Sequence, residues 1–103
     1  MSLPSLPSGI GKRGTITDIN GNKRRFSIID EIIQVQSTNP EKAVYLQQIQ
    51  FEQDKRIELR LGYYIIGKKS GRAGKWVWGQ YATMLPVEDF RKIISKAIEK
   101  GWI

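Results

Sequence analysis

Short runs rich in apolar residues, several of them alternating with polar ones, recur along this chain of 103 residues, and a period of two is typical of β-strands. They predict strands over residues 15–19, 24–36, 43–51, 57–66 and 76–82. After residue 85 the period changes, and apolar side chains recur three and four positions apart, as on one face of a helix. The pattern therefore predicts an α+β protein, with a sheet of four to five strands followed by one C-terminal helix.

The first half of the chain contains a turn and an irregular strand. Asn20-Gly21-Asn22 predicts a tight turn between the first two strands, because Asn and Gly accept positive φ at little cost. Within residues 24–36 the apolar positions change phase, which predicts either a β-bulge or a strand buried on both faces. A helical turn from Asp30 to Ile33 is the alternative interpretation.

The predicted helix begins at Pro86 and ends near Lys100. Proline suits the first helical position, because its missing N–H would have no intrahelical partner there. Glu88 and Asp89 stand in the first turn and Lys96 in the last, as the helix dipole favours. The apolar stripe has to lie against the sheet or a partner, and in a domain this small we expect a homodimer interface. The stripe consists of Phe90, Ile93, Ile94, Ala97 and Ile98.

The composition predicts one folded domain with a tail. Residues 1–13 are rich in Pro, Ser and Gly and cannot bury enough surface to offset their ordering entropy, so we expect a flexible basic tail. Residues 14–103 are expected to form a single domain, since 40% of the chain is hydrophobic. No apolar run approaches a membrane span, and the N-terminus lacks the apolar stretch of a secretory signal. We therefore expect a cytoplasmic, nucleoid-associated protein with no membrane partner.

The missing residue types narrow the possible chemistry. Without cysteine there is no disulfide and no thiolate zinc site, and without histidine the commonest general base is absent. Magnesium held by carboxylates, as in nucleases, is the remaining catalytic hypothesis. Its candidates are Asp30, Glu31, Glu52, Asp54 and Glu58. Solvated acids are the simpler interpretation, because the Asp and Glu-x-Lys spacing of restriction-type nucleases is absent. We expect a non-catalytic protein with no metal and no cofactor.

The charge is basic and unevenly distributed. The formal net charge is +7, made up of +4 over residues 1–25, −4 over residues 26–54, +6 over residues 55–75 and +1 over residues 86–103. Such clustering is typical of proteins that bind polyanions. A protein that is simply basic is the alternative on charge alone.

The densest cluster of cations and aromatic side chains lies in residues 57–83, where two aromatic strands flank a Gly- and Lys-rich loop at 67–75. Aromatic rings stack on unpaired bases, and neighbouring cations neutralise phosphates. The pairing indicates nucleic acid, single-stranded more than double-stranded. The loop cations are Lys68, Lys69, Arg72 and Lys75. Lys55, Arg56 and Arg60 would extend the same surface if the strand over residues 57–66 lies near the groove. Lys23, Arg24 and Arg25 beside the first turn are further candidates for phosphate contact, with a solvated turn as the alternative.

Alternation also predicts which face of the sheet each aromatic side chain occupies. Ile57, Leu59, Leu61, Tyr63 and Ile65 share one face, which we predict to be the core face. We therefore expect Tyr64 on the wet face, with Tyr81 as its companion in base stacking. Trp76 and Trp78 are expected in the core or an interface, and they are the alternative stacking pair.

Three segments match a known pattern. The segments are Ile57-Glu58-Leu59-Arg60-Leu61-Gly62-Tyr63-Tyr64, Gly71-Arg72-Ala73-Gly74-Lys75 and Leu85-Pro86-Val87-Glu88-Asp89-Phe90. In that order they resemble the second strand, the basic glycine loop and the helix start of the positive cofactor four type of single-stranded DNA-binding transcriptional coactivators. That family is related in fold to the Whirly proteins. The resemblance spans about residues 44–98. It implies a curved antiparallel sheet backed by a helix, and a homodimer whose paired sheets line a groove for single strands. The departures are Leu85 in place of Ser, Thr or Asn, the N-terminal hairpin, and residues 76–81.

These observations predict a non-catalytic protein that binds single-stranded DNA or RNA, as an accessory factor in transcription, replication or repair. A protein-interaction or dimerisation module, built on the helix stripe with Trp102 and Ile103, is the alternative. A metal-dependent nuclease is the least favoured of the three hypotheses.

Overall fold

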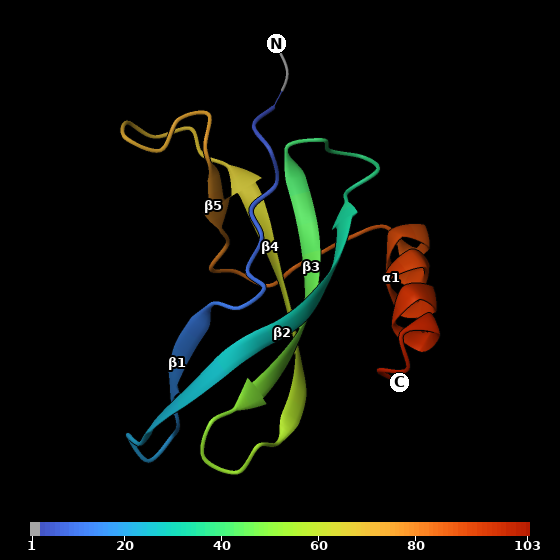
Figure 1. The fold of residues 1–103 in the computed structure, drawn as a ribbon. Coiled ribbons are helices and arrows are strands. Elements are labelled where there is room, and N and C mark those ends of the chain that lie inside the picture. The colour runs from blue at the N-terminus through green and yellow to red at the C-terminus, as the bar shows by residue number, and fades with distance from the viewer. Residues whose placement is uncertain (1–2) are drawn as a thin grey trace.

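A computed structural model describes residues 3–103, which form one antiparallel sheet and one helix (Figure 1). The strands are β1 (Arg13–Thr17), β2 (Lys23–Val35), β3 (Lys42–Phe51), β4 (Ile57–Ile66) and β5 (Trp76–Trp78), arranged in that order in the sheet. Helix α1 spans Val87–Glu99. The predicted α+β architecture, a curved antiparallel sheet followed by a single C-terminal helix, is confirmed. Within residues 3–103 no helix has the length and apolar content needed to cross a membrane.

The sheet is curled, and β2 runs diagonally across the view of Figure 1 while it pairs with β3 from Phe26 to Val35. The register between β2 and β3 shifts between Ile28 and Asp30, so Ile29 is an extra residue on β2. The predicted β-bulge is confirmed, and residues 30–33 are strand, not a helical turn. The predicted turn before β2 is also present, with Gly21 at φ 84°. Since a bulge bends its strand and increases the local twist, Ile29 contributes to the curl.

Helix α1 packs on only half of one face of the sheet. Its residues Ile93 and Ala97 are fully buried, and they form the main core cluster with side chains from β2 and β3. Those sheet residues are Ile32, Val44 and Leu46. The predicted dimer stripe is therefore divided. Ile93 and Ala97 are unavailable to a partner because they pack inside their own chain, whereas Ile94 is half-buried and Phe90 and Ile98 are exposed.

The other half of that face lies on β4 and is uncovered. Ile57, Leu59, Leu61 and Ile65 are between 38% and 46% exposed. Only Tyr63 of the predicted core face is buried. The prediction that this is the core face of β4 is wrong, because α1 packs on β2 and β3 while the N-terminal segment covers the opposite face.

The N-terminal segment, residues 3–12, runs across the face of the sheet opposite α1 (Figure 1). The backbone N–H of Gly9 donates to a Glu31 carboxylate oxygen at 2.9 Å, and that of Gly11 donates to the Ile28 carbonyl at 2.8 Å. Arg13, predicted to end a flexible tail, is the first residue of β1. Movement of residues 3–12 in solution stays a prediction, but they have specific partners on the sheet.

A hydrogen-bonded ion pair fastens the end of α1 to β2. The Lys100 ammonium lies 2.9 Å from an Asp30 carboxylate oxygen, and this hydrogen bond lowers the pKa of Asp30. A carboxylate whose pKa is lower in the folded state adds stability above its unfolded pKa, about 3.9. That stability is lost as the pH falls through the folded-state pKa. Because both side chains are partly exposed, we expect a contribution below about 1 kcal/mol.

Asp30→Asn is therefore expected to lower the free energy of unfolding slightly at pH 7, and to change it little near pH 2. Urea unfolding at the two pH values measures this difference. Glu88→Gln is the control, because it removes a carboxylate from an ion pair with Arg91 in which the two side chains are 71% and 72% exposed. A loss for Asp30→Asn that is as large at low pH as at pH 7 would contradict the ion-pair explanation.

Candidate nucleic-acid interface

The loop between β4 and β5, residues 67–75, is folded by its own hydrogen bonds. The Gly67 N–H donates to the Lys75 carbonyl at 2.8 Å, and the Gly74 N–H donates to the Gly67 carbonyl at 3.0 Å. Gly71 and Gly74 have φ of 83° and 75°, which other residues rarely adopt. A Cβ at Gly67 would lie 2.4 Å from the Arg72 carbonyl oxygen. The glycines therefore shape a defined hairpin tip that positions the loop cations.

A cleft of about 360 Å³ lies where this loop meets β4, β5 and the segment after β5. Its lining combines apolar and aromatic side chains with cations. The aromatic and apolar residues include Tyr63, Ile65, Val77 and Tyr81, and the cations are Lys68, Lys69 and Arg72. Ile65 and Val77 are cross-strand partners on the face that α1 half covers. The cleft therefore brings Tyr81 together with three of the four predicted loop cations; the fourth, Lys75, is exposed on the loop outside it.

Tyr81 is held by its backbone, and its side chain is solvated. The Gly79 N–H donates to the Tyr63 carbonyl at 2.8 Å, and the Tyr81 N–H donates to the Tyr63 hydroxyl at 3.4 Å. A Cβ at Gly79 would approach the Tyr63 ring to 2.0 Å, so only glycine lets the chain pass this close. The Tyr81 side chain itself is exposed, with 85% of the residue accessible. A fixed backbone under a solvated ring suits stacking on an unpaired base.

The positive charge at the cleft is mostly uncompensated. Lys68 Nζ lies 2.9 Å from a Glu41 carboxylate oxygen, so its charge is shared with the β2–β3 turn. Lys69 and Arg72 are exposed and make no ion pair with another residue of the described part of the chain. These two cations are therefore available to an anionic ligand.

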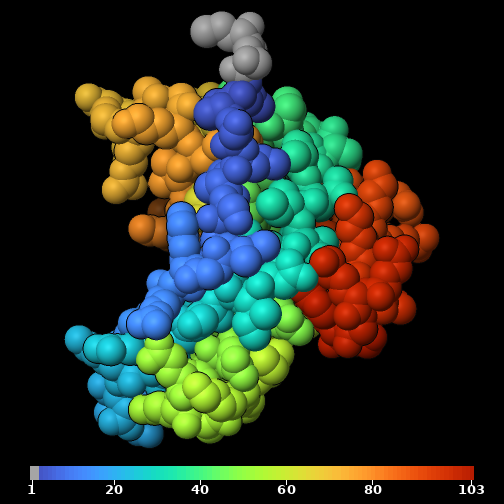
Figure 2. All heavy atoms as spheres, viewed as in Figure 1, coloured from blue at the N-terminus to red at the C-terminus, as the bar shows by residue number. Residues whose placement is uncertain are grey.

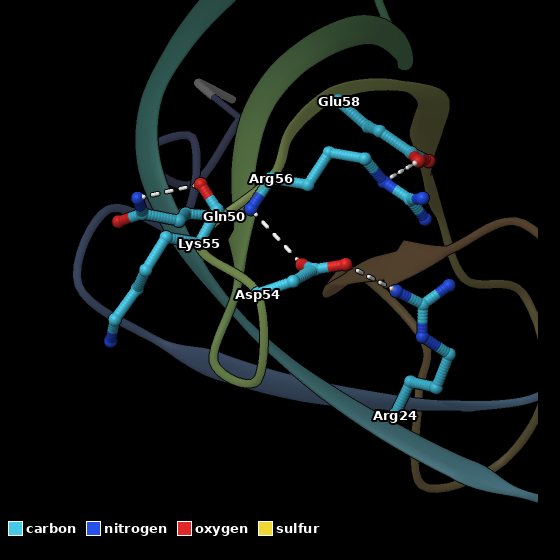
Figure 3. Close-up of polar contacts among 6 residues, drawn as sticks. All are labelled: Arg24, Gln50, Asp54, Lys55, Arg56 and Glu58. Atoms are coloured by element: carbon cyan, nitrogen blue, oxygen red, sulfur yellow. Dashed lines mark hydrogen bonds and ion pairs between the residues drawn. The ribbon is translucent and has the colours of Figure 1, made fainter.

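A second group of predicted cations lies at the opposite end of the sheet, beside the β1–β2 and β3–β4 turns (Figure 1). There the Glu52 N–H of the β3–β4 turn donates to the Arg25 carbonyl of β2 at 3.0 Å. Arg24 lies 3.6 Å from the Asp54 carboxylate, and Arg56 lies 2.8 Å from the Glu58 carboxylate (Figure 3). The backbone N–H of Arg56 lowers the pKa of Asp54. The exposed cations here without an ion pair among residues 3–103 are Lys23, Arg25 and Lys55.

The sequence pattern predicts that these cations extend the basic surface of the 67–75 loop. In the structure the two groups lie at opposite ends of the sheet and do not form one surface. The ten residues of β4 separate the two ends of the sheet, and at ~3.3 Å per residue that is about 30 Å. A single strand of nucleic acid would have to run the length of β4 to touch both ends.

The remaining predicted aromatic residues point to the sheet face beneath the N-terminal segment, and one of them, Trp78, also borders the cleft. Tyr64 and Trp78 are direct cross-strand partners and share that face, and Trp76 points the same way. The Tyr64 ring is centred 4.9 Å from both the Tyr45 and Trp78 rings. The expectation that Tyr64 and Tyr81 share one wet face opposite Trp76 and Trp78 is wrong. The register across the nine-residue loop pairs Tyr64 with Trp78 and leaves Tyr81 beyond the strand.

Comparison of the chain with protein-family models, curated proteins and solved structures finds no match. The resemblance to the positive cofactor four family stays a prediction. The cleft also contains residues that the sequence interpretation did not place in a site, and these include Tyr63, Ile65, Val77 and Gln80. The alternation of the first three on β4 and β5 was visible, but the pairing of Ile65 with Val77 follows only from the register.

Arg60 has an internal role instead of a place on a basic surface. Its Nε donates to the Gln47 side-chain oxygen at 2.8 Å, and its guanidinium lies 4.8 Å from the Trp78 ring centre and 5.1 Å from that of Phe26. Burial lowers the pKa of Arg60, yet an arginine stays charged in proteins. The half-buried cation is balanced through Gln47, which donates to the Glu31 carboxylate at 2.7 Å.

The carboxylates considered for a metal site do not come together. Asp30 binds Lys100, and Glu31 accepts from Gly9 and Gln47. Across residues 3–103, no group of three or more acidic side chains is placed to hold a metal ion. Glu52, Asp54 and Glu58 form ion pairs with Arg13, Arg24 and Arg56.

Proposed function

We propose that this protein is a non-catalytic single-stranded nucleic-acid-binding protein, and that it binds through the cleft at residues 67–81. One observation carries the proposal: the solvated ring of Tyr81 stands in the same cleft as Lys69 and Arg72, which have no ion pair within residues 3–103. Stacking on an aromatic ring is tolerant of base identity, and phosphate contacts carry no sequence information. Binding is therefore expected to depend little on sequence.

The cleft favours unpaired bases over a duplex. In a duplex the faces of the bases are covered by their neighbours, so Tyr81 would gain no stacking surface. Single-stranded DNA and single-stranded RNA offer the same base faces and phosphates, and we take DNA as the first ligand to test. An accessory role in transcription, replication or repair follows from such binding.

A second candidate function, self-association, is favoured by a different surface. Phe90 and Ile98 of α1 are 43% and 59% exposed, and on the same side of the molecule Ile57, Leu59 and Leu61 of β4 are uncovered. Exposed apolar residues gathered on one side mark interaction surfaces. A homodimer through Phe90, Ile94 and Ile98 would bury part of them. Sedimentation velocity at micromolar concentration tests it, and a monomer there would contradict the dimer.

Replacing Lys69 and Arg72 by Ala tests the nucleic-acid proposal. We expect weaker binding to every single-stranded sequence, because phosphate contacts are lost. The slope of log K against log salt should become shallower by about 0.7 for each lost contact. Fluorescence anisotropy with labelled single-stranded DNA, single-stranded RNA and duplex DNA, over a range of salt, measures both quantities.

Lys92→Ala with Lys96→Ala is the matched control. It removes the same two charges from exposed residues of α1 that make no ion pair within residues 3–103. The control should keep the salt slope of the unmodified protein. If both double variants lose affinity equally, the binding is a response to net charge and the cleft is not the site.

A further inference from the structure

The N-terminal segment contacts the sheet through its carbonyl groups. The Trp76 indole N–H donates to the Pro4 carbonyl at 2.9 Å, and the Tyr45 hydroxyl donates to the Pro7 carbonyl at 2.6 Å. In Figure 2 the N-terminal atoms lie across the sheet between the 67–75 loop and the atoms of β2 and β3. Two aromatic donors from different strands therefore bind two carbonyls that are three residues apart.

The three-residue spacing of the two carbonyls matches the repeat of a polyproline II helix. Pro4-Ser5-Leu6-Pro7 is a Pro-x-x-Pro sequence, and a polyproline II helix has three residues per turn. Carbonyls three residues apart then point the same way, and none is used in an internal hydrogen bond. Aromatic grooves with N–H and O–H donors are a recurring way of binding such segments, because proline fixes their conformation before binding.

The aromatic side chains beneath the segment pack against one another, and two of them act as hydrogen-bond donors. The rings of Tyr45, Tyr64 and Trp78 form a cluster, in which Tyr64 lies 4.9 Å from each of the other two and these lie 6.4 Å apart. Tyr45 is fully buried, and burial raises the pKa of its phenol, so the hydroxyl remains a donor at physiological pH. An indole N–H only donates. Both donors are therefore suited to carbonyl acceptors.

The segment is anchored at its far end by glycine. A Cβ at Gly9 would lie 2.8 Å from the Glu31 carboxylate and 3.2 Å from the Gln47 amide. Two residues later Gly11 has φ of 85°. Neither hydrophobic core cluster includes a residue of 3–8, and Leu3 is 41% exposed. Residues 3–8 therefore add no side chain to either core cluster.

We propose that this face is a binding site for a Pro-x-x-Pro segment of a partner protein, which residues 3–8 of the chain occupy until they are displaced. The two donors recognise backbone carbonyls, so another chain with the same spacing offers the same acceptors. A tethered segment acts at an effective concentration in the millimolar range, so the partner has to compete with it. Exchange between two copies is disfavoured, since it repeats the same contacts while adding the cost of association.

The test uses the full chain with Pro4→Gly and Pro7→Gly, which keeps the carbonyls but loosens the segment. The probe is a synthetic peptide with the sequence of residues 3–9, followed through the ¹⁵N–¹H resonance of the Trp76 indole. We expect the double variant to bind the peptide on the order of tenfold more tightly than the unmodified chain, where the tethered segment competes. In the variant background, Tyr45→Phe removes the hydroxyl donor to the Pro7 carbonyl and keeps the Trp76 reporter, so it should weaken peptide binding. The matched Tyr81→Phe removes a hydroxyl from an exposed tyrosine and should keep peptide binding. A peptide with Gly at both proline positions should not bind.

Gly9→Ala provides a second way of loosening the segment if the proline variant does not fold. A loosened variant that keeps its circular dichroism spectrum, but shows no shift of the Trp76 resonance at millimolar peptide, would overturn the proposal. It would also be overturned if the resonance moves only with a single-stranded oligonucleotide, or only with self-association of the chain. The two donors of this site, Trp76 and Tyr45, do not line the cleft, whereas Trp78 borders both sites. Variants of the two donors therefore test this proposal separately from the proposed nucleic-acid function.

Discussion

Tyr81→Ala is expected to weaken the binding of single-stranded oligonucleotides by about 1–3 kcal/mol, which corresponds to roughly 5- to 150-fold in affinity. The ring is 85% exposed beside the loop cations, so it has room for a base. Its removal should leave the melting temperature unchanged, because an exposed side chain adds little to stability. Fluorescence anisotropy and thermal denaturation on the same protein samples measure the two quantities.

Tyr64→Ala is the comparison that separates the two sheet faces. Tyr64 lies half-buried between Tyr45 and Trp78, beneath the N-terminal segment. Its loss is expected to lower the melting temperature while the affinity of the folded protein for oligonucleotides stays the same. The opposite result, with affinity lost in Tyr64→Ala and retained in Tyr81→Ala, would move the nucleic-acid site to the face that residues 3–8 cover.

Ile93→Ala is expected to lower the free energy of unfolding by about 2–5 kcal/mol. Ile93 is fully buried between α1 and the sheet, where it packs with Ile32, Val44 and Leu46. The substitution removes buried methyl groups and leaves a cavity where the helix meets the strands. Urea unfolding followed by circular dichroism measures the loss, which should appear as a lower midpoint with an unchanged slope.

Ile98→Ala is the control on the same helix. It removes the same groups from a residue that is 59% exposed, so the expected change is within about 0.5 kcal/mol for the monomer. If α1 mediates a homodimer, Ile98→Ala should instead weaken association in sedimentation experiments. Equal losses of stability in the two variants would show that α1 presents a different face to the sheet.

The strands and the helix were predictable because local residues specify them. The Asn20-Gly21-Asn22 turn, the change of phase before Ile32 and the stripe from Phe90 to Ile98 each record a local backbone preference or a burial pattern. The covered face of β4 was not predictable in this way. Which face of β4 is covered depends on residues 3–12, and these bind the sheet largely through backbone groups. Every residue has a backbone carbonyl, so the sequence does not reveal which carbonyls accept hydrogen bonds from the sheet.

The candidate site was predictable in part. The loop cations and Tyr81 stand out by composition, and the structure places Lys69, Arg72 and Tyr81 around one cleft. Two parts were beyond local reasoning. The register across residues 67–75 decides which aromatic residues share a face, and the length of β4 separates the loop from Arg24 and the other cations of the first turn.

The strand order bears on the sequence in which contacts form as the chain folds. Each strand pairs only with its neighbours in the sequence, so the hairpins can form one after another, and a chain rich in local pairings folds rapidly. The hydrogen bond between Pro4 and Trp76 is different, since it joins residues 72 positions apart. During synthesis Pro4 leaves the ribosome before β5 does, so its hydrogen bond to Trp76 cannot form until β5 has emerged. The contacts of Pro7, Gly9 and Gly11 involve only β2 and β3 and are available earlier, so the segment can dock in two stages.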